Sequence, residues 1–313
     1  MKKTFLLIAL IISITNISCE PEEQIVKSDL QQNDSIKDAD INSYENWDAF
    51  HKAYSEYAKM DVEALESTSF YSVEKDNMVY SPALQAILNE DNQFKLNNEI
   101  IELVDGNFIK KSIAKNGKST SEKVGSVFAT PVSTDNEDLE KSVEINLNRA
   151  YWELKEFRQQ RYINCQNGVN HGGPSARNFR FLHQAFGEYI ITGFQHNYNL
   201  WLRLYLEYNH RRGSWRLSGE NREIFVNVTD NSFLTNLQNP NRPAYPDFSG
   251  NPTTYNLRFS NSCHSHKSFL LRTFNNPGSL GGTPIWQINL NGTIKQKMTG
   301  DVESNRWTHN INW

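Results

Sequence analysis

The sequence predicts a mainly β protein, in which a small α+β module precedes a C-terminal antiparallel β domain of the sandwich or barrel type. Two observations carry this prediction. Between Leu200 and Tyr208, leucines alternate with aromatic and charged residues, which is the period of a strand with two different faces. Short segments of this kind recur through the second half of the chain, separated by turns rich in Gly, Pro and Asn.

Composition indicates where the chain divides. Residues 20–143 contain 25 Asp and Glu, 12 Lys and no Arg, a net charge of −13, whereas residues 144–313 have a net charge of +7 and six of the seven Trp. A shift of this size indicates two regions under different constraints. We predict a signal peptide at 1–18, a flexible acidic tether at 19–42, a helix plus β-meander module at 43–113, a linker at 114–143 and the β-rich domain at 144–313.

The first residues have the pattern of a bacterial lipoprotein signal. Lys2 and Lys3 precede an apolar run from Phe5 to Ile14, and Ser18 precedes Cys19. A short basic start, an apolar segment too brief to span a bilayer and small residues before the cut define a secretory signal. We therefore expect processing to acylate Cys19 and make it the first residue of the mature chain. An ordinary signal that ends near a chance cysteine is the alternative.

Two short stretches resemble known proteins. Residues 19–23 (Cys-Glu-Pro-Glu-Glu) are similar to the acidic stretch that follows the lipidated cysteine in surface-exposed lipoproteins of the Bacteroidota. Residues 86–96 and 99–103 resemble a short module of uncharacterised secreted proteins from that phylum. The resemblance implies lineage and location only, namely a lipid anchor in the outer membrane on a chain that faces the periplasm or the cell surface.

In the N-terminal module, aromatic residues recur at three- and four-residue steps over 47–57, which predicts an amphipathic helix after a cap at Ser43. Pro82 can open a second helical turn. Asp105-Gly106 predicts a tight hairpin, because both residues can take positive φ. The strands expected here are 94–96, 99–104 and 107–113.

In the β-rich domain, Asn291-Gly292 predicts a second hairpin, between strands at 284–290 and 293–298. Residues 146–158 have helical spacing and predict the one helix of the domain. The other strands expected here are 187–192, 200–208, 223–228, 255–259 and 268–274.

After lipidation of Cys19, Cys165 and Cys263 remain. Because the expected compartment is oxidising, we predict a disulfide between them. A catalytic cysteine that works with His171 or His264 is the alternative.

The histidines are weak candidates for a metal site. His264 and His266 would share one face of a strand, and His171 lies in a Gly-rich loop, so the three together could bind zinc. No carboxylate has ligand spacing beside them and no metalloprotease motif is present, so we expect neither a metal nor a cofactor. Glu188 and Glu207 could act as a glycosidase pair if they met across a cleft, but carboxylates with a structural role are the commoner case.

The residues around the strand at 200–208 are the candidate binding site. Arginine and aromatic groups together can hold anionic or sugar-like ligands through charge-assisted hydrogen bonds and ring stacking. Two alternatives are that these arginines pair with the acidic N-terminal half and that they form a solvated strand face. The candidates are Arg203, Arg211, Arg212, Trp201, Tyr205 and Trp215.

Three classes of function stay open. The leading class is a membrane-anchored binding or accessory lipoprotein, whose partner is a glycan, a polyanion or a protein, because this class needs no catalytic motif. A secreted hydrolase, with or without a metal, is disfavoured because no catalytic constellation is recognised. A structural envelope protein is the third. We expect membrane contact through the lipid on Cys19 and no nucleic acid partner.

Overall fold

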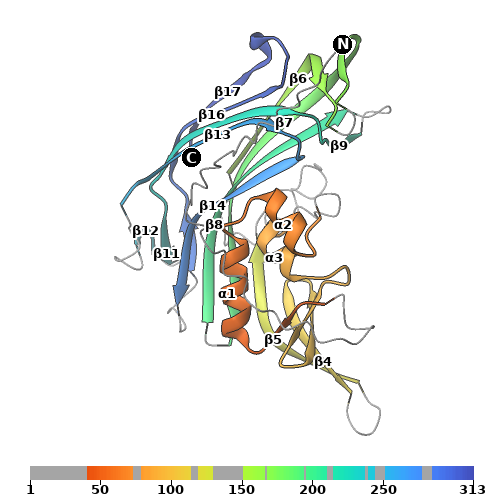
Figure 1. Cartoon of the computed structure of the whole chain (residues 1–313). Coiled ribbons are helices and arrows are strands. Elements are labelled where there is room, and N and C mark those ends of the chain that lie inside the picture. Colours follow the sequence, from red (N-terminus) through yellow and green to blue (C-terminus); the bar gives the residue numbers. More distant parts are fainter. Residues whose placement is uncertain are drawn as a thin grey trace, which may run out of the picture. The chain divides into compact units, whose positions relative to one another are not determined.

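The computed structural model describes residues 41–72, 79–113, 119–129, 151–165, 168–193, 195–209, 214–236, 239–243, 251–276 and 284–313 (Figure 1). The chain from Asp40 to Trp313 belongs to one compact unit. Strands dominate the described residues, which confirms the prediction of a mainly β chain. None of the described helices combines the length and the hydrophobicity that crossing a bilayer requires.

Short α-helices precede the long strands. They are α1 (Trp47–Tyr57), α2 (Val62–Thr68) and α3 (Pro82–Ile87), and a 3₁₀ helix, η3 (Glu303–Asn305), lies between the last two strands. The strands are β1 (Ser43–Tyr44), β2 (Gln93–Leu96), β3 (Glu99–Val104), β4 (Asn107–Ile113), β5 (Ser119–Ala129), β6 (Tyr151–Ile163), β7 (Asn170–Thr192), β8 (Gln195–Asn209), β9 (Trp215–Leu217), β10 (Arg222–Asp230), β11 (Phe233–Asn236), β12 (Asn239–Pro243), β13 (Thr253–Ser262), β14 (His266–Asn276), β15 (Pro284–Gln287), β16 (Leu290–Met298) and β17 (Trp307–Asn312).

These strands form three sheets within the described part of the chain. A ten-stranded sheet has the order β1-β2-β3-β4-β5-β7-β8-β14, with β6 paired to β7 and β9 paired to β8. A four-stranded sheet has the order β13-β10-β16-β17, and a three-stranded sheet has the order β12-β11-β15. The pair β1–β2 is parallel. The other strand pairs are antiparallel, as expected where short turns join neighbouring strands.

Helices α1, α2 and α3 each begin at a polar side chain that accepts a backbone hydrogen bond. Asn46 Oδ1, Asp61 Oδ1 and Ser81 Oγ accept from the amide three residues ahead at 2.9, 2.8 and 3.2 Å. Each cap stabilises its helix by about 1 kcal/mol. Helix α1 therefore starts after Asn46, and Ser43, the expected cap, lies in β1.

The first of two main cores lies between these helices and one face of the ten-stranded sheet (Figure 1). The ring of Phe50 in α1 lies 4.9 Å from that of Phe94 in β2, measured between centroids. Ile190 of β7 and Trp201 of β8 belong to the same cluster. We call this the helix-covered face, defined by the residues of β7 and β8 that point toward α1 and α3, which include Phe186, Glu188, Ile190, Trp201 and Arg203.

The second core lies between the ten-stranded and four-stranded sheets. Leu200, Leu202 and Leu204 of β8 pack in one cluster with Val226 of β10 and Ile294 of β16, and all five are fully buried. The alternation predicted along 200–208 is thus confirmed for the leucines. The intervening residues are buried as well, because the helices cover the opposite face of β8.

Cys165 and Cys263 form the expected disulfide, with their Cα atoms 5.7 Å apart. Cys165 follows β6 of the ten-stranded sheet, and Cys263 lies in the turn between β13 and β14. The bond therefore fixes the corner at which the chain passes from the four-stranded sheet to the ten-stranded one.

Two predicted segments have a different structure. Residues 119–129 of the predicted linker form β5, which pairs with β4 on one side and β7 on the other. Strands from both sides of the predicted domain boundary therefore belong to one sheet. Gly125 of β5 permits this pairing, because a Cβ there would lie 2.7 Å from the Ile191 carbonyl oxygen. The predicted helix at 146–158 is also wrong from residue 151 on, where the described residues begin, since Tyr151–Ile163 form β6, whose backbone pairs along β7.

The predicted hairpin at Asp105-Gly106 is confirmed, with φ values of 47° and 71° between β3 and β4. The one at Asn291-Gly292 is wrong, because both residues lie inside β16, paired with Thr229 and Val228 of β10. A Cβ on Gly292 would lie 2.2 Å from the Asn227 carbonyl oxygen, so this glycine serves a close approach of two strands. The predicted signal peptide, Cys19 and the tether up to residue 40 lie outside the described residues.

Candidate binding surface

One side of the four-stranded sheet faces away from the core and carries the candidate site. Along β10, Ile224, Val226 and Val228 are buried, whereas Phe225 and Asn227 point outward, as strand geometry requires. The registers place outward residues of neighbouring strands side by side. We call this the outer face; its residues are Thr254, Asn256, Arg258 and Ser260 of β13, Glu223, Phe225, Asn227 and Thr229 of β10, Asn291, Thr293, Lys295 and Lys297 of β16, and Thr308, Asn310 and Asn312 of β17.

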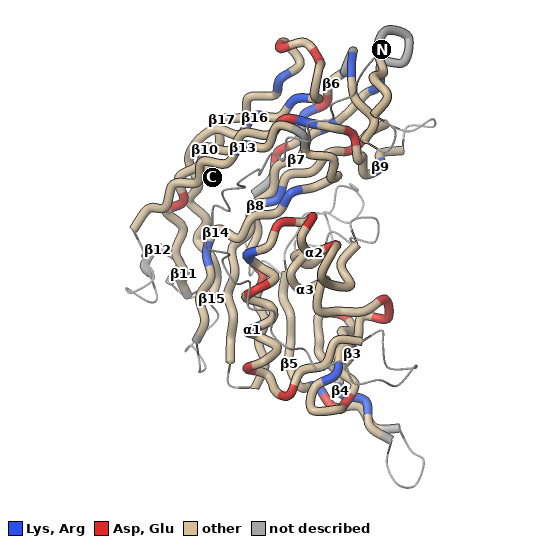
Figure 2. Tube along the Cα trace, in the orientation of Figure 1, with Lys and Arg blue, Asp and Glu red and all other residues tan. Residues whose placement is uncertain are grey.

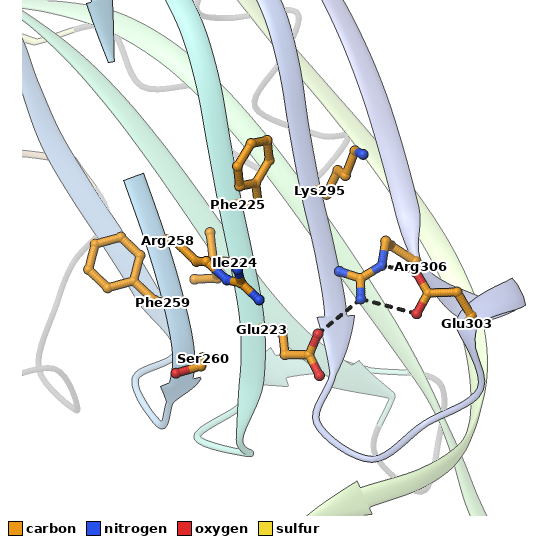
Figure 3. Close-up of a pocket in the computed structure, with 9 residues that line it drawn as sticks. All are labelled: Glu223, Ile224, Phe225, Arg258, Phe259, Ser260, Lys295, Glu303 and Arg306. Atoms are coloured by element: carbon orange, nitrogen blue, oxygen red, sulfur yellow. Dashed lines mark hydrogen bonds and ion pairs between the residues drawn. The ribbon is translucent and has the colours of Figure 1, made fainter. Parts of the chain in front are cut away.

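A cavity of about 460 Å³ lies at the charged end of the outer face (Figure 3). Strand β10 supplies its floor, and β13, β16 and η3 supply its sides. Cationic, anionic and aromatic side chains all reach it, so the cavity can form charge-assisted contacts beside an apolar platform. The lining residues are Glu223, Ile224, Phe225, Arg258, Phe259, Ser260, Lys295, Glu303 and Arg306.

One group of these charges is neutralised within the protein. Arg306 binds Glu303 and lies 2.9 Å from Glu223 Oε2 (Figure 3). Lys297, next to the cavity, has its Nζ 3.0 Å from Glu303 Oε2. The hydrogen bonds from Arg306 and Lys297 lower the pKa of Glu303 to about 2. Glu303 is therefore ionised at neutral pH, and Arg306 and Lys297 are paired with carboxylates inside the protein.

A second pair of cations has no such partner. Among the described residues, no ion pair involves Arg258 or Lys295, although Lys295 Nζ lies 5.8 Å above the ring of Phe225. Arg258, Phe225 and Lys295 stand side by side on three adjacent strands, so the Cα atoms of Arg258 and Lys295 are separated by two strand spacings, about 10 Å. The site therefore offers two anion-binding groups on either side of one aromatic ring.

The candidate residues on β8 are in a different environment. Arg203 is fully buried: its Nη1 donates to Tyr205 Oη at 2.7 Å, its Nε donates to Ser268 Oγ at 3.2 Å and its Nη2 donates to the Tyr80 carbonyl. Trp201 and Tyr205 are 2 and 1 % exposed. This corrects the prediction of an exposed basic and aromatic face at these three residues. The physical reason is that β8 lies inside the sheet, beneath the helices.

The other members of that set do not join them at one site. Trp215 of β9 packs its ring 4.6 Å from the guanidinium of Arg180 on β7. Arg211 and Arg212 lie outside the described residues. The acidic N-terminal half does form an ion pair with the second half of the chain, but through a lysine: Lys267, at the start of β14, binds Glu63 of α2. Figure 2 marks the acidic residues of that helix.

The three candidate metal ligands have separate partners. His264 lies before β14, and its ring nitrogens lie 3.0 Å from Glu63 and 3.1 Å from Glu66, which raises its pKa. His266 is buried with Nε2 2.6 Å from Tyr71 Oη. His171 stacks on another ring, that of Tyr162. No metal-binding group of three or more His, Cys, Asp or Glu side chains is found in the described part of the chain.

The two candidate carboxylates are also separate. Glu188 is fully buried and accepts hydrogen bonds from Tyr54 Oη at 2.6 Å and the Ser81 amide at 2.7 Å, while burial raises its pKa. Glu207 pairs with Arg180. Glu188 lies opposite Asn199, eight residues before Glu207 on β8, which is about 26 Å along the strand. Paired catalytic carboxylates of glycosidases lie within about 10 Å of each other, so these two do not form such a pair.

We find no protein-family model, no curated protein and no solved structure that matches this chain. Its function is therefore inferred from its own residues.

The sequence analysis did not identify Arg258 and Lys295 as candidate binding residues, because they are far apart in the chain. The signal that could have found them is the polar half of the alternation in 223–229, 254–260, 291–297 and 308–312, where Asn, Thr, Lys and Arg occupy one face.

Proposed function

We propose that this chain is a lipid-anchored binding module of a bacterial outer membrane, and that the outer face of its four-stranded sheet binds a polyanion. The observation that carries the proposal is the pair of cations, Arg258 and Lys295, on either side of Phe225 with no carboxylate partner among the described residues. The lipoprotein signal predicted at 1–18, followed by Cys19, supports the anchor.

Energetics favour a polymer over a small anion. An exposed ion pair contributes only about 0.2 to 1 kcal/mol, so two such contacts hold a single small anion weakly. A polymer that offers many equivalent charges to several membrane-anchored copies gains from effective concentration without any new contact. A lipid anchor would supply such an array of copies.

The charge proposal is tested by binding. The purified full-length protein in detergent is titrated with dextran sulfate by interferometry at 50 and 300 mM salt. The double variant Arg258→Ala, Lys295→Ala should bind at least about tenfold more weakly at low salt, and its affinity should depend less on salt, because fewer counter-ions are released.

The matched control is Lys52→Ala, Lys59→Ala, which removes the same charge from exposed positions on and just after α1. It should bind like the wild type. Equal binding by the wild type and the outer-face variant would refute the assignment of this surface. No binding by the wild type would favour a structural envelope role.

The anchor has its own test. Cys19→Ala should remove fatty-acid labelling and release the protein from the membrane fraction, because Cys19 is the acylation point that the signal offers. Labelling that persists in this variant would contradict lipidation at Cys19.

A further inference from the structure

The outer face continues beyond its charged end as two rows of Asn and Thr. The strand registers align one outward residue from each of β13, β10, β16 and β17 in each row. Every one of the eight is partly or fully exposed. The first row consists of Asn256, Asn227, Thr293 and Asn310, and the second of Thr254, Thr229, Asn291 and Asn312.

The rows are held in place from the side and from below. Thr293 Oγ1 donates to Asn310 Oδ1 at 3.0 Å, and the hydroxyls of Thr229 and Thr254 lie 3.0 Å apart. The residues that alternate with these, such as Val226, Val228 and Ile294, are fully buried in the core between the sheets. The backbone that presents the rows is therefore packed before any ligand binds, which lowers the entropy cost of binding.

Several amide groups in these rows remain available. Within the described part of the chain, the side chains of Asn227 and Asn256 make no hydrogen bond with other protein groups, and both are exposed. A side-chain amide donates and accepts, as does a hydroxyl. The chemistry that matches such a surface is a ligand rich in hydroxyl groups.

The amide rows and the cations lie within reach of one ligand. Asn227 is two residues from Phe225 on the same face of β10, about 7 Å along the strand. Arg258 and Lys295 flank Phe225 on the neighbouring strands, with their Cα atoms about 10 Å apart. A ligand that places acidic groups on the cations therefore places its neighbouring groups on the amides.

Resting on the function proposed above, we infer that the polyanion is an acidic polysaccharide, whose carboxylate or sulfate groups bind Arg258 and Lys295 while its hydroxyls bind Asn227 and Asn256. Phe225 offers the sugar ring an apolar platform. A protein partner fits this face poorly, because the centre of a protein interface is rich in large apolar residues and the outer face presents a single one, Phe225.

The test compares three polymers of similar length on the full-length protein in detergent: polygalacturonate, which carries carboxylates and hydroxyls, polyglutamate, which carries carboxylates but no hydroxyls, and neutral dextran. At one salt concentration, polygalacturonate should bind at least about tenfold more tightly than polyglutamate, since about two additional hydrogen bonds are worth that factor. Dextran should bind more weakly than polygalacturonate by a similar factor or more.

The residue test uses Asn227→Ala, Asn256→Ala. This variant should lose about tenfold in affinity for polygalacturonate and keep its affinity for polyglutamate. The control is Asn170→Ala, Asn178→Ala, which removes two exposed asparagines from β7 and should change neither affinity. Thermal unfolding of each variant confirms that it is folded.

The outcomes separate the two proposals. If polyglutamate and polygalacturonate bind equally and the Asn227, Asn256 variant matches the wild type, the polysaccharide inference is overturned while polyanion binding stands. If dextran binds as tightly as polygalacturonate, the requirement for acidic groups is overturned. If no anionic polymer binds, the proposed function itself fails.

Discussion

The helix-covered face and the outer face each contain an arginine, and they differ in what covers that arginine. On the helix-covered face, Arg203 is fully buried, donates to three oxygen acceptors and lies with its guanidinium carbon 4.5 Å from the ring centroid of Phe186. On the outer face, Arg258 is exposed and no described residue forms an ion pair with it. An arginine beneath the helices thus stabilises the fold, whereas an arginine on the exposed outer face can contact a ligand.

Polar groups on the helix-covered face hold the helices to the sheet. Glu188 of β7 accepts hydrogen bonds from Tyr54 of α1 and Ser81, the cap of α3. On the outer face, polar neighbours bond sideways along the sheet, as Thr293 does with Asn310. Burial therefore predicts which substitutions lower stability and which lower binding.

The largest expected effect comes from the disulfide, which ties the two regions together. Replacing Cys165 and Cys263 by Ser should lower the free energy of unfolding by about 4 kcal/mol, because the bond closes a loop with a sequence separation of 98 residues. Urea unfolding with and without reductant measures this. Wild type and variant should coincide once the wild type is reduced; a persistent difference would show that the loss is not due to the bond.

The next effect should come from Arg203→Ala, at about 3 kcal/mol or more. The substitution removes one hydrogen-bond donor from each of the Tyr80 carbonyl and the hydroxyls of Tyr205 and Ser268, and it removes a packed side chain. The matched substitution, Arg258→Ala, should change stability by less than about 0.5 kcal/mol. Similar losses in urea unfolding for the two variants would break the distinction between the faces.

Acid should destabilise the helix-covered face. Burial lowers the pKa of His51 to about 4, so the unfolded chain takes up this proton near pH 6.5 and the folded chain does not. The free energy of unfolding should therefore fall as the pH drops from about 6.5 to 4, by about 3 kcal/mol from His51. His264, with a raised pKa, acts in the opposite direction: its contribution is present below about pH 6.5 and is lost as the pH rises through its folded-state pKa.

The measurement is urea unfolding at several pH values for the wild type and His51→Asn. The difference in free energy between the two should shrink as the pH falls from 6.5 toward 4, since the variant cannot take up this proton. A constant difference would contradict the assigned pKa shift.

The smallest effect concerns the outer face under the same acid. No histidine belongs to this face, and the pKa of the cavity carboxylate Glu303 is about 2. The affinity for dextran sulfate should therefore change by less than about twofold between pH 7.5 and 6. A larger change, in a protein that circular dichroism shows to be folded, would place a titrating group at the binding site.

Local patterns predicted the elements that depend on neighbours in sequence. The aromatic spacing over 47–57 gave α1, and Asp105-Gly106 gave the β3–β4 hairpin. The oxidising compartment expected from the signal, together with the two remaining cysteines, predicted the Cys165–Cys263 disulfide that the structure shows. In each case, the deciding interaction lies within a few residues or follows from residue chemistry alone.

Partners distant in sequence decided the rest. The Ser- and Thr-rich segment 119–129 has few large apolar residues, and it is a strand because β4 and β7 complete its hydrogen bonds. The pair Asn291-Gly292 is typical of a turn, but both residues lie in a strand. Glycine is needed at 292 because the backbone of β10 lies too close to leave room for a side chain.

The amino-acid sequence by itself determined that the chain is mainly β and that β8 alternates leucine with other side chains. It also determined that Cys165 and Cys263 are the two cysteines that can form a disulfide once Cys19 is lipidated. Only the tertiary structure decided that Arg203 is covered while Arg258 is exposed. The reason is that an alternating strand specifies two faces but not what packs on each, and coverage of β8 comes from helices more than a hundred residues away in the chain.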